Sequence, residues 1–69
     1  MNWDDVRVFL AVARTGTLTH AATHLKLGVA TVTRRLDRLE TDLGVKLFSR
    51  HQSGYFITDE GAALLSRAE

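Results

Sequence analysis

The sequence predicts a mainly α-helical domain with one small β-hairpin, and three observations support this fold class. Apolar residues recur at helical spacing along residues 3–13 and again further on. A short turn at Leu27-Gly28 separates two of the helical segments. Two β-prone segments, 46–49 and 55–57, flank a polar turn and predict a hairpin after the third helix. This order of elements is that of a winged helix-turn-helix, with a three-helix core and a two-stranded β wing.

The first helix is expected to begin after Asn2, whose side chain can accept a hydrogen bond from a free amide of the first turn. Gly16 is expected to end it, because glycine adopts the left-handed conformation there without strain. The residues expected to face the core are spaced three and four apart: Trp3, Val6, Phe9, Leu10 and Ala13.

Val8 and Val12 lie outside that stripe. A second apolar stripe on a short helix predicts a contact beyond the domain's own core. We expect these valines to contact a second subunit, together with Leu64 and Leu65 of an apolar fourth helix that starts near Thr58. Two isolated exposed valines are the alternative.

The second helix is expected to span about two turns, capped by Thr17 or Thr19, with small residues on its inward side. The hydroxyls and free amides at its start could bind a phosphate, although capping alone would also explain the threonines.

The third helix is expected over residues 29–43, closed by Gly44. Its core face carries Val32, Leu36, Leu39 and Leu43, and the far side carries Ala30, Thr33, Arg34 and Asp37. The major groove of DNA admits one helix, and bases there are recognised by short side chains and by arginine. Arg34 could therefore reach guanine, unless this is an ordinary solvated helix face. Thr31 and Arg38 flank the core stripe, where a phosphate could be contacted.

Arg50 and His51 lie at the base of the predicted hairpin and could contact backbone phosphates or a minor groove. A pairing of Arg50 with a carboxylate is the alternative.

Composition bounds the remaining possibilities. The chain has 69 residues, no cysteine and a net charge of +1, which fits one domain without disulfides. Residues 20–51 carry six lysines and arginines against three acidic residues, a formal +3 located where the third helix lies. No segment is long and apolar enough to span a membrane, and no signal peptide is present, so we expect a cytoplasmic protein.

His20 and His24 stand four residues apart, which is a spacing found in zinc sites. The metalloprotease pattern needs glutamate at the position of Ala21, and no nucleophile has a companion base. We expect no enzyme, no metal and no cofactor; a metal-dependent hydrolase would rest on these two histidines alone.

The chain resembles the DNA-binding domain of LysR-type bacterial transcriptional regulators over essentially its whole length. The matching segments are W-x-x-V-R-V-F-L-A-V-A, G-T-L-T-x-A-A-x-x-L, T-V-T-R-R-L-x-R-L-E-x-x-L-G-V-x-L-F-x-R and I-T-x-E-G-x-x-L-L, in that order. The resemblance implies a transcription factor with an N-terminal winged helix-turn-helix, a long linker helix that dimerises and a C-terminal effector-binding domain. It would make residues 1–58 the DNA-binding domain and 59–69 the start of the linker helix. The effector domain is expected to be absent from the chain, so an effector would act only through that missing part.

The resemblance also implies roles for individual residues. Thr17 and Thr19 match phosphate-contacting positions, and Thr31 and Arg50 match positions near the DNA backbone. The positions that match base-facing ones are Val29, Ala30, Thr33 and Arg34. Such regulators usually carry serine at Gly28, a polar residue at Val29 and often proline at Ala30, while Ser53 and Phe56 occupy wing positions that are often basic. Specificity is therefore expected to rest on Arg34, on Thr33 and on apolar contact of Val29 with a thymine methyl group.

The expected function is sequence-specific binding of double-stranded DNA as a homodimer on a dyad-symmetric site. The alternative is a winged helix used for protein interaction or dimerisation, with no DNA target. The balanced overall charge and the uncharged tip of the hairpin favour that alternative slightly.

Overall fold

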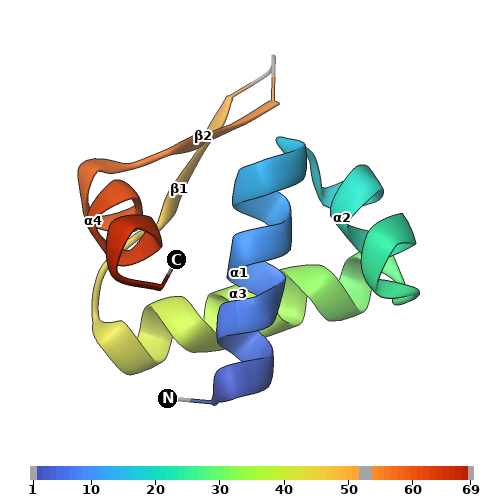
Figure 1. Cartoon of the computed structure of the whole chain (residues 1–69), viewed down its shortest axis with the longest axis horizontal. Coiled ribbons are helices and arrows are strands. Elements are labelled where there is room, and N and C mark those ends of the chain that lie inside the picture. Colours follow the sequence, from blue (N-terminus) through green and yellow to red (C-terminus); the bar gives the residue numbers. More distant parts are fainter. Residues whose placement is uncertain (1, 52–53, 69) are drawn as a thin grey trace.

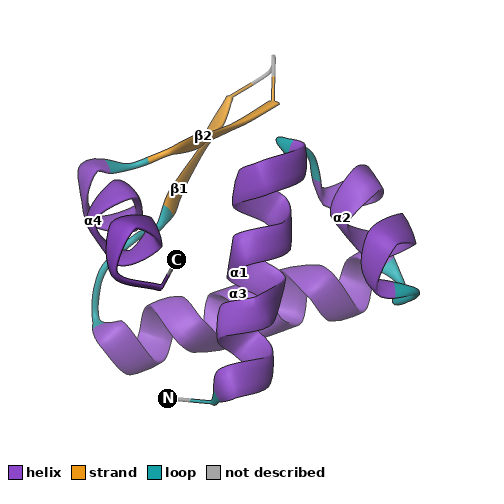
Figure 2. Cartoon of the chain, viewed as in Figure 1, coloured by secondary structure: helices purple, strands orange, loops and turns teal. Residues whose placement is uncertain are grey.

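The structure is a computed structural model that describes residues 2–51 and 54–68. Its elements in chain order are α1 (Trp3–Thr15), α2 (Leu18–Leu25), α3 (Val29–Leu43), β1 (Phe48–His51), β2 (Gly54–Ile57) and α4 (Asp59–Ala68). The helix α1 lies in the middle, in front of α3, with α2 on one side and α4 and the hairpin on the other (Figure 1). The helices and the single antiparallel hairpin form the predicted winged helix-turn-helix (Figure 2).

The helix ends follow the local signals in the sequence. The Asn2 side chain accepts a hydrogen bond from the Asp4 amide at 2.8 Å, and Gly16 ends α1 with φ at 81°. Thr17, not Thr19, caps α2 by accepting from the His20 amide at 3.1 Å. The bounds of α3 are those predicted, and Gly44 closes it with φ at 72°.

The turn between α2 and α3 differs from the prediction in one respect. Lys26 takes the left-handed conformation (φ 59°, ψ 40°), whereas Gly28 is extended with φ at −76°. The Leu27 amide donates to the Ala22 carbonyl at 2.9 Å and the Lys26 amide donates to the Thr23 carbonyl at 3.2 Å, so two carbonyls at the end of α2 are satisfied. The sharp change of direction therefore occurs at Lys26.

The predicted subunit contact through Val8 and Val12 is wrong. These side chains are only 2% and 1% exposed and belong to the core, while Trp3, predicted to be inside, is 64% exposed. The reason is that α1 packs against α2, α3 and α4, so burial covers more than half of its circumference. The sequence signal for this was the run from Val6 to Val12, in which Arg7 is the only charged residue.

The other half of the predicted subunit contact lies on α4. Leu64 and Leu65 are half-buried and pack against the same core. They keep only part of their surface for any partner.

The hairpin begins two residues later than predicted because the side chain of Glu40 binds the preceding backbone. Its Oε2 accepts from the amides of Leu47 and Phe48 at 2.7 and 3.3 Å. Leu47 is fully buried, and the ring of Phe48 lies between those of Phe9 and Tyr55, with centroids 5.5 and 5.9 Å away. The hairpin is thereby fixed to both α3 and α1.

Thr58 joins the hairpin to α4. Its hydroxyl donates to the Lys46 carbonyl at 2.6 Å and accepts from the Gly61 amide at 3.0 Å, which caps α4. Its own amide donates to the Leu47 carbonyl at 3.0 Å. Gly61 packs so closely here that a Cβ would collide with the Leu47 carbonyl oxygen and lie 2.8 Å from Cγ1 of Ile57.

A charged pair joins α1 to α3. The Asp5 carboxylate is fully buried and accepts from Nε and Nη2 of Arg38 at 2.7 and 2.6 Å. The hydrogen bonds from Arg38 hold the pKa of Asp5 below its ordinary value, although burial opposes them. This pair spans 33 positions of the sequence.

Replacing Gly61 by alanine is expected to destabilise the chain by about 1–3 kcal/mol, because the added methyl group meets backbone that cannot move freely. Gly28→Ala is the matched control, since a Cβ there meets nothing within 4 Å and φ is negative. It should destabilise the chain by less than about 1 kcal/mol, because alanine is only a poorer N-cap of α3 than glycine. Urea denaturation of both variants provides the measurement, and equal effects would contradict the packing argument.

The Asp5–Arg38 pair predicts a specific loss of stability in acid. Because the pKa of Asp5 is lowered on folding, the contribution of its ionised form is complete above the unfolded-state value of about 3.9. That contribution disappears as the pH falls through the lower pKa of the folded state. The difference in urea midpoint between the native chain and Asp5→Asn should be largest above about pH 4 and shrink below it. A difference that persists unchanged to about pH 2 would show that the carboxylate's charge is not what matters.

Candidate DNA interface

The helix α3 is held from one side only. Val32, Leu36 and Leu39 are buried against the rest of the domain. On the opposite face Ala30, Arg34 and Asp37 are exposed. Val29, Ala30 and Arg34, three of the four side chains expected to face bases, are thus on the surface at the end of α3 that follows the turn from α2.

The three arginines of α3 have different surroundings. Arg38, predicted to contact the DNA backbone, binds Asp5 through Nε and Nη2, but its side chain is 53% exposed and keeps further N–H donors. Arg35 is half-buried, with Nη1 4.0 Å from Asp4. Within the ranges that the structure describes, Arg34 has no carboxylate within 4.0 Å. Arg34 is therefore the arginine of α3 whose guanidinium is free to bind an external acceptor.

The threonines of α3 are less accessible than its far face. Thr33 is half-buried, and its hydroxyl donates to the Val29 carbonyl at 3.0 Å. Its oxygen keeps the capacity to accept a hydrogen bond. Thr31 is also half-buried, while Val29 is 42% exposed. The exposed apolar atoms of Val29 fit the predicted contact with a thymine methyl group.

The N-termini of α2 and α3 both carry backbone amides that no helix carbonyl accepts. Gly28 provides no side-chain cap, so the amides of the first turn of α3 have no side-chain acceptor from it. Thr17 and Thr19 are exposed at the start of α2, where Thr17 is the cap. Positive helix ends and exposed hydroxyls together suit phosphate groups.

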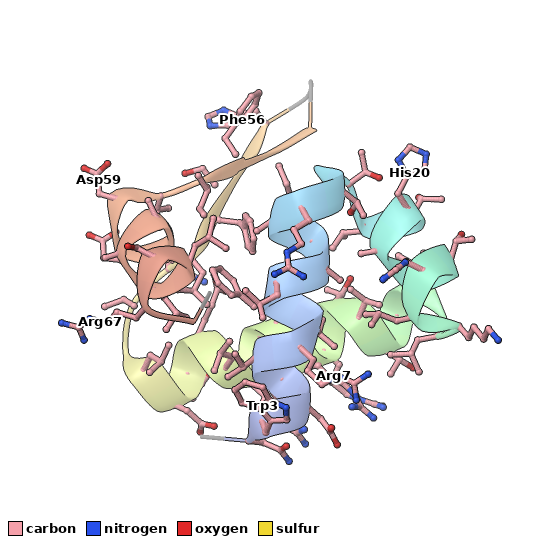
Figure 3. All side chains as sticks on the ribbon, in the orientation of Figure 1. Trp3, Arg7, His20, Phe56, Asp59 and Arg67 are labelled. Atoms are coloured by element: carbon pink, nitrogen blue, oxygen red, sulfur yellow. The ribbon has the colours of Figure 1, made fainter. Side chains whose placement is uncertain are left out.

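The hairpin presents an aromatic surface. The ring of His51 is exposed and meets Phe56 edge to face, with centroids 5.4 Å apart, and Phe56 is 52% exposed (Figure 3). Arg50 is opposite Tyr55 in the strand pairing, but its side chain is outside the described part of the structure, as is Ser53. An open groove of about 520 Å³ separates the hairpin from α3 and is lined by Asp37, Lys46 and His51, among others.

The histidine pair of α2 finds no further ligands. Within residues 2–51 and 54–68, no group of three or more histidine, cysteine, aspartate or glutamate side chains could hold a metal ion. His20 and His24 are both exposed. None of the described helices is long and apolar enough to cross a bilayer.

Residues 3–62 match the lysR family of bacterial regulatory helix-turn-helix proteins, and the chain therefore belongs to this family. It is 44% identical over 68 residues to the uncharacterized HTH-type transcriptional regulator YusT of Bacillus subtilis, covering 99% of this chain and 23% of that protein. It is 43% identical over 65 residues to the Mau operon transcriptional activator of Paracoccus denitrificans, covering 94% of this chain and 23% of the relative. The chain thus spans about a quarter of the length of these regulators.

The structure is similar to that of a solved DNA complex. The protein in the crystal structure of the CbnR_DBD–DNA complex superimposes with a TM-score of 0.94 at 37% identity, covering 99% of this chain and 78% of that chain. Full-length CbnR, a LysR family transcriptional regulator, gives a TM-score of 0.93, with 99% of this chain and 24% of that one covered.

The different surroundings of Arg34 and Arg38 predict different effects on stability. Arg34→Ala should leave the unfolding free energy within about 0.5 kcal/mol of the native value, as surface substitutions usually do. Arg38→Ala should destabilise clearly, because it leaves the buried Asp5 carboxylate without its partner. Thermal unfolding at neutral pH measures both, and equal shifts would mean that the Asp5–Arg38 pair contributes little.

Proposed function

We propose that this chain is the DNA-binding domain of a LysR-family transcriptional regulator and that it binds specific double-stranded DNA sequences. The N-terminal half of α3 enters the major groove, with its leucines packed behind it. The observation that carries the proposal is the exposed face of α3, on which Arg34 pairs with no carboxylate of residues 2–51 and 54–68, on a fold similar to the protein of the CbnR_DBD–DNA complex. The family gives no support to a winged helix without a DNA target.

The base-facing residues in this proposal are those on the exposed side near the start of α3: Val29, Ala30, Thr33 and Arg34. Arg34 donates two hydrogen bonds from one edge of its guanidinium to guanine O6 and N7. Ala30 is small enough to let the backbone approach, and Val29 contacts a thymine methyl group. Thr33 accepts a hydrogen bond from a base or a bound water, since its proton is used within the helix.

Phosphates flank this contact. Thr17 and Thr19 bind one strand at the start of α2, and Thr31 lies near the same backbone. Arg50 and His51 of the hairpin bind the other side. Asp37 and Glu40 reduce the charge of the later turns of α3, so the DNA follows the first turns of that helix.

The regulator acts as a homodimer on a dyad-symmetric site, with half-sites one helical turn apart or a multiple of that. Residues 59–69 begin the linker helix, and Leu64 and Leu65 contribute their remaining exposed surface to the dimer. A small-molecule effector binds outside residues 1–69, in a part corresponding to the further length of the relatives. The protein works in the cytoplasm, where the bacterial chromosome lies, and performs no catalysis.

Selection of bound sequences from random duplexes tests this proposal as a whole. It should yield a consensus with dyad symmetry, and the affinity for that consensus should fall steeply with salt because bound counterions are released. Binding that is indifferent to sequence and to salt would contradict the proposed docking.

Arg34→Ala should weaken binding to the selected site by roughly 1–3 kcal/mol and relax the preference at one base pair. Arg14→Ala is the matched control, because Arg14 is an exposed arginine outside the proposed DNA contacts, at the end of α1. The affinity of this variant for the selected site should remain unchanged. Gel shifts on the selected and on random duplexes provide the comparison. Equal losses on both would assign Arg34 to a phosphate and not to a base.

A further inference from the structure

The side of α1 that faces away from α3 carries three exposed residues, Trp3, Arg7 and Arg14, and the half-buried Leu10. Trp3, Arg7, Leu10 and Arg14 follow one another at spacings of four, three and four, so they share one face of the helix. At about 100° per residue this face is roughly opposite Asp5, whose carboxylate binds α3. We call it the α1 outer stripe. In Figure 3, Trp3 and Arg7 project from the lower part of α1, in front of α3.

A groove runs beside this stripe, between α1 and α2. It has a volume of about 350 Å³ and is lined by Arg7 and Arg14 of α1 and His24 of α2, with Leu10, Ala11 and Leu25 at its apolar base. None of its lining side chains is acidic. A partly buried apolar floor thus lies between basic side chains, on the side of α1 away from α3.

The arginines of the groove are available for a ligand. Arg7 has one contact, 4.0 Å from Asp4, between two side chains that are 61% and 57% exposed. Such an exposed pair contributes little. No carboxylate lies within 4.0 Å of Arg14 among the residues that the structure describes. Arginine and tryptophan are also the residues that most often dominate the energy of protein interfaces.

We propose that this groove and the α1 outer stripe bind an acidic amphipathic helix of a partner protein. A third helix can pack into the groove between two helices, with its leucines on Leu10 and Leu25. Its carboxylates then accept paired hydrogen bonds from Arg7 and Arg14. Since the stripe faces away from α3, the partner binds the chain while DNA occupies α3.

Two other occupants fit the groove less well. A nucleic acid would place phosphates on the arginines but has no apolar side chain to cover the two leucines. A second copy of this chain offers Asp59 and Glu60 in the first turn of α4, but that helix also carries Arg67, which two arginines would repel.

The probe is a synthetic helical peptide of about 18 residues with glutamate on one face, leucine on the other and no tryptophan. A counterpart with lysine in place of glutamate serves as the control peptide. Trp3 is the only tryptophan of the chain, so its fluorescence reports binding at the stripe directly. The acidic peptide should bind, shift the Trp3 emission and lose affinity with added salt, and the basic peptide should not bind.

Arg14→Glu should lower the affinity for the acidic peptide about tenfold or more. A tenfold decrease corresponds to a loss of about 1.4 kcal/mol of binding free energy. Arg67→Glu is the matched control, because both arginines lie in the last turn of a helix and are exposed. The peptide should also bind the chain when it is saturated with its selected DNA. Equal binding of the two peptides, an equal loss in the Arg67 variant, or displacement of the DNA by the peptide would overturn the proposal.

Sedimentation without peptide tests whether a second copy of the chain occupies the groove. Arg14→Glu should leave the association state of the chain unchanged. If that variant instead abolishes a dimer formed by the native chain, the groove binds a second copy and the proposed partner is wrong.

Discussion

The burial of α1 on more than half of its circumference is the constraint on which the other elements depend. Phe9 at its centre is fully buried and contacts the ring of Phe48 from the hairpin, while the small residues Ala21 and Ala22 of α2 approach from another side. A domain of 69 residues without cysteine has one core only, so each element must be placed against this helix. The arrangement of α3 relative to the β1–β2 hairpin follows from the contact that both make with α1.

The position of α3 is determined by three different interactions along its length. Leu36 and Leu39 anchor it by apolar burial, Arg38 binds the buried carboxylate of Asp5, and Glu40 accepts the two amides that precede and begin the hairpin. Directional polar contacts of this kind restrict rotation of a helix about its axis. Apolar packing alone restricts that rotation less. Rotation matters here, because turning α3 about its axis would move Arg34 and Ala30 together away from the exposed side of the domain.

The two sides of the molecule therefore have different electrostatic roles. On the α3 side, acidic residues accompany the later turns, and the free positive charge is concentrated near the start of the helix. On the α1 side, Arg7 and Arg14 remain exposed beside an apolar groove that contains no acidic side chain. The net charge of +1 does not reveal this separation, because it is a sum over two surfaces to which we assign different ligands.

The sequence alone determined the local elements and the family. Asn2, Gly16 and Gly44 specify helix ends through interactions with backbone one turn away, and the spacing of leucines in α3 specifies which side faces the core. These signals are short-range, so they can be recognised without knowing the fold. The exposed face with Ala30 and Arg34 followed from the same periodicity, and the proposed assignment of bases and phosphates to single residues is still untested.

Only the tertiary structure decided which residues are left free. Val8 and Val12 looked available because periodicity assumes that a helix has one buried face, whereas α1 is covered by several neighbours. Arg38 resembled Arg34 as a surface cation until the fold brought it to Asp5, 33 residues away. Whether a charged or apolar side chain faces solvent depends on every element packed around it, and that information is distributed over the whole chain and not held in any local pattern.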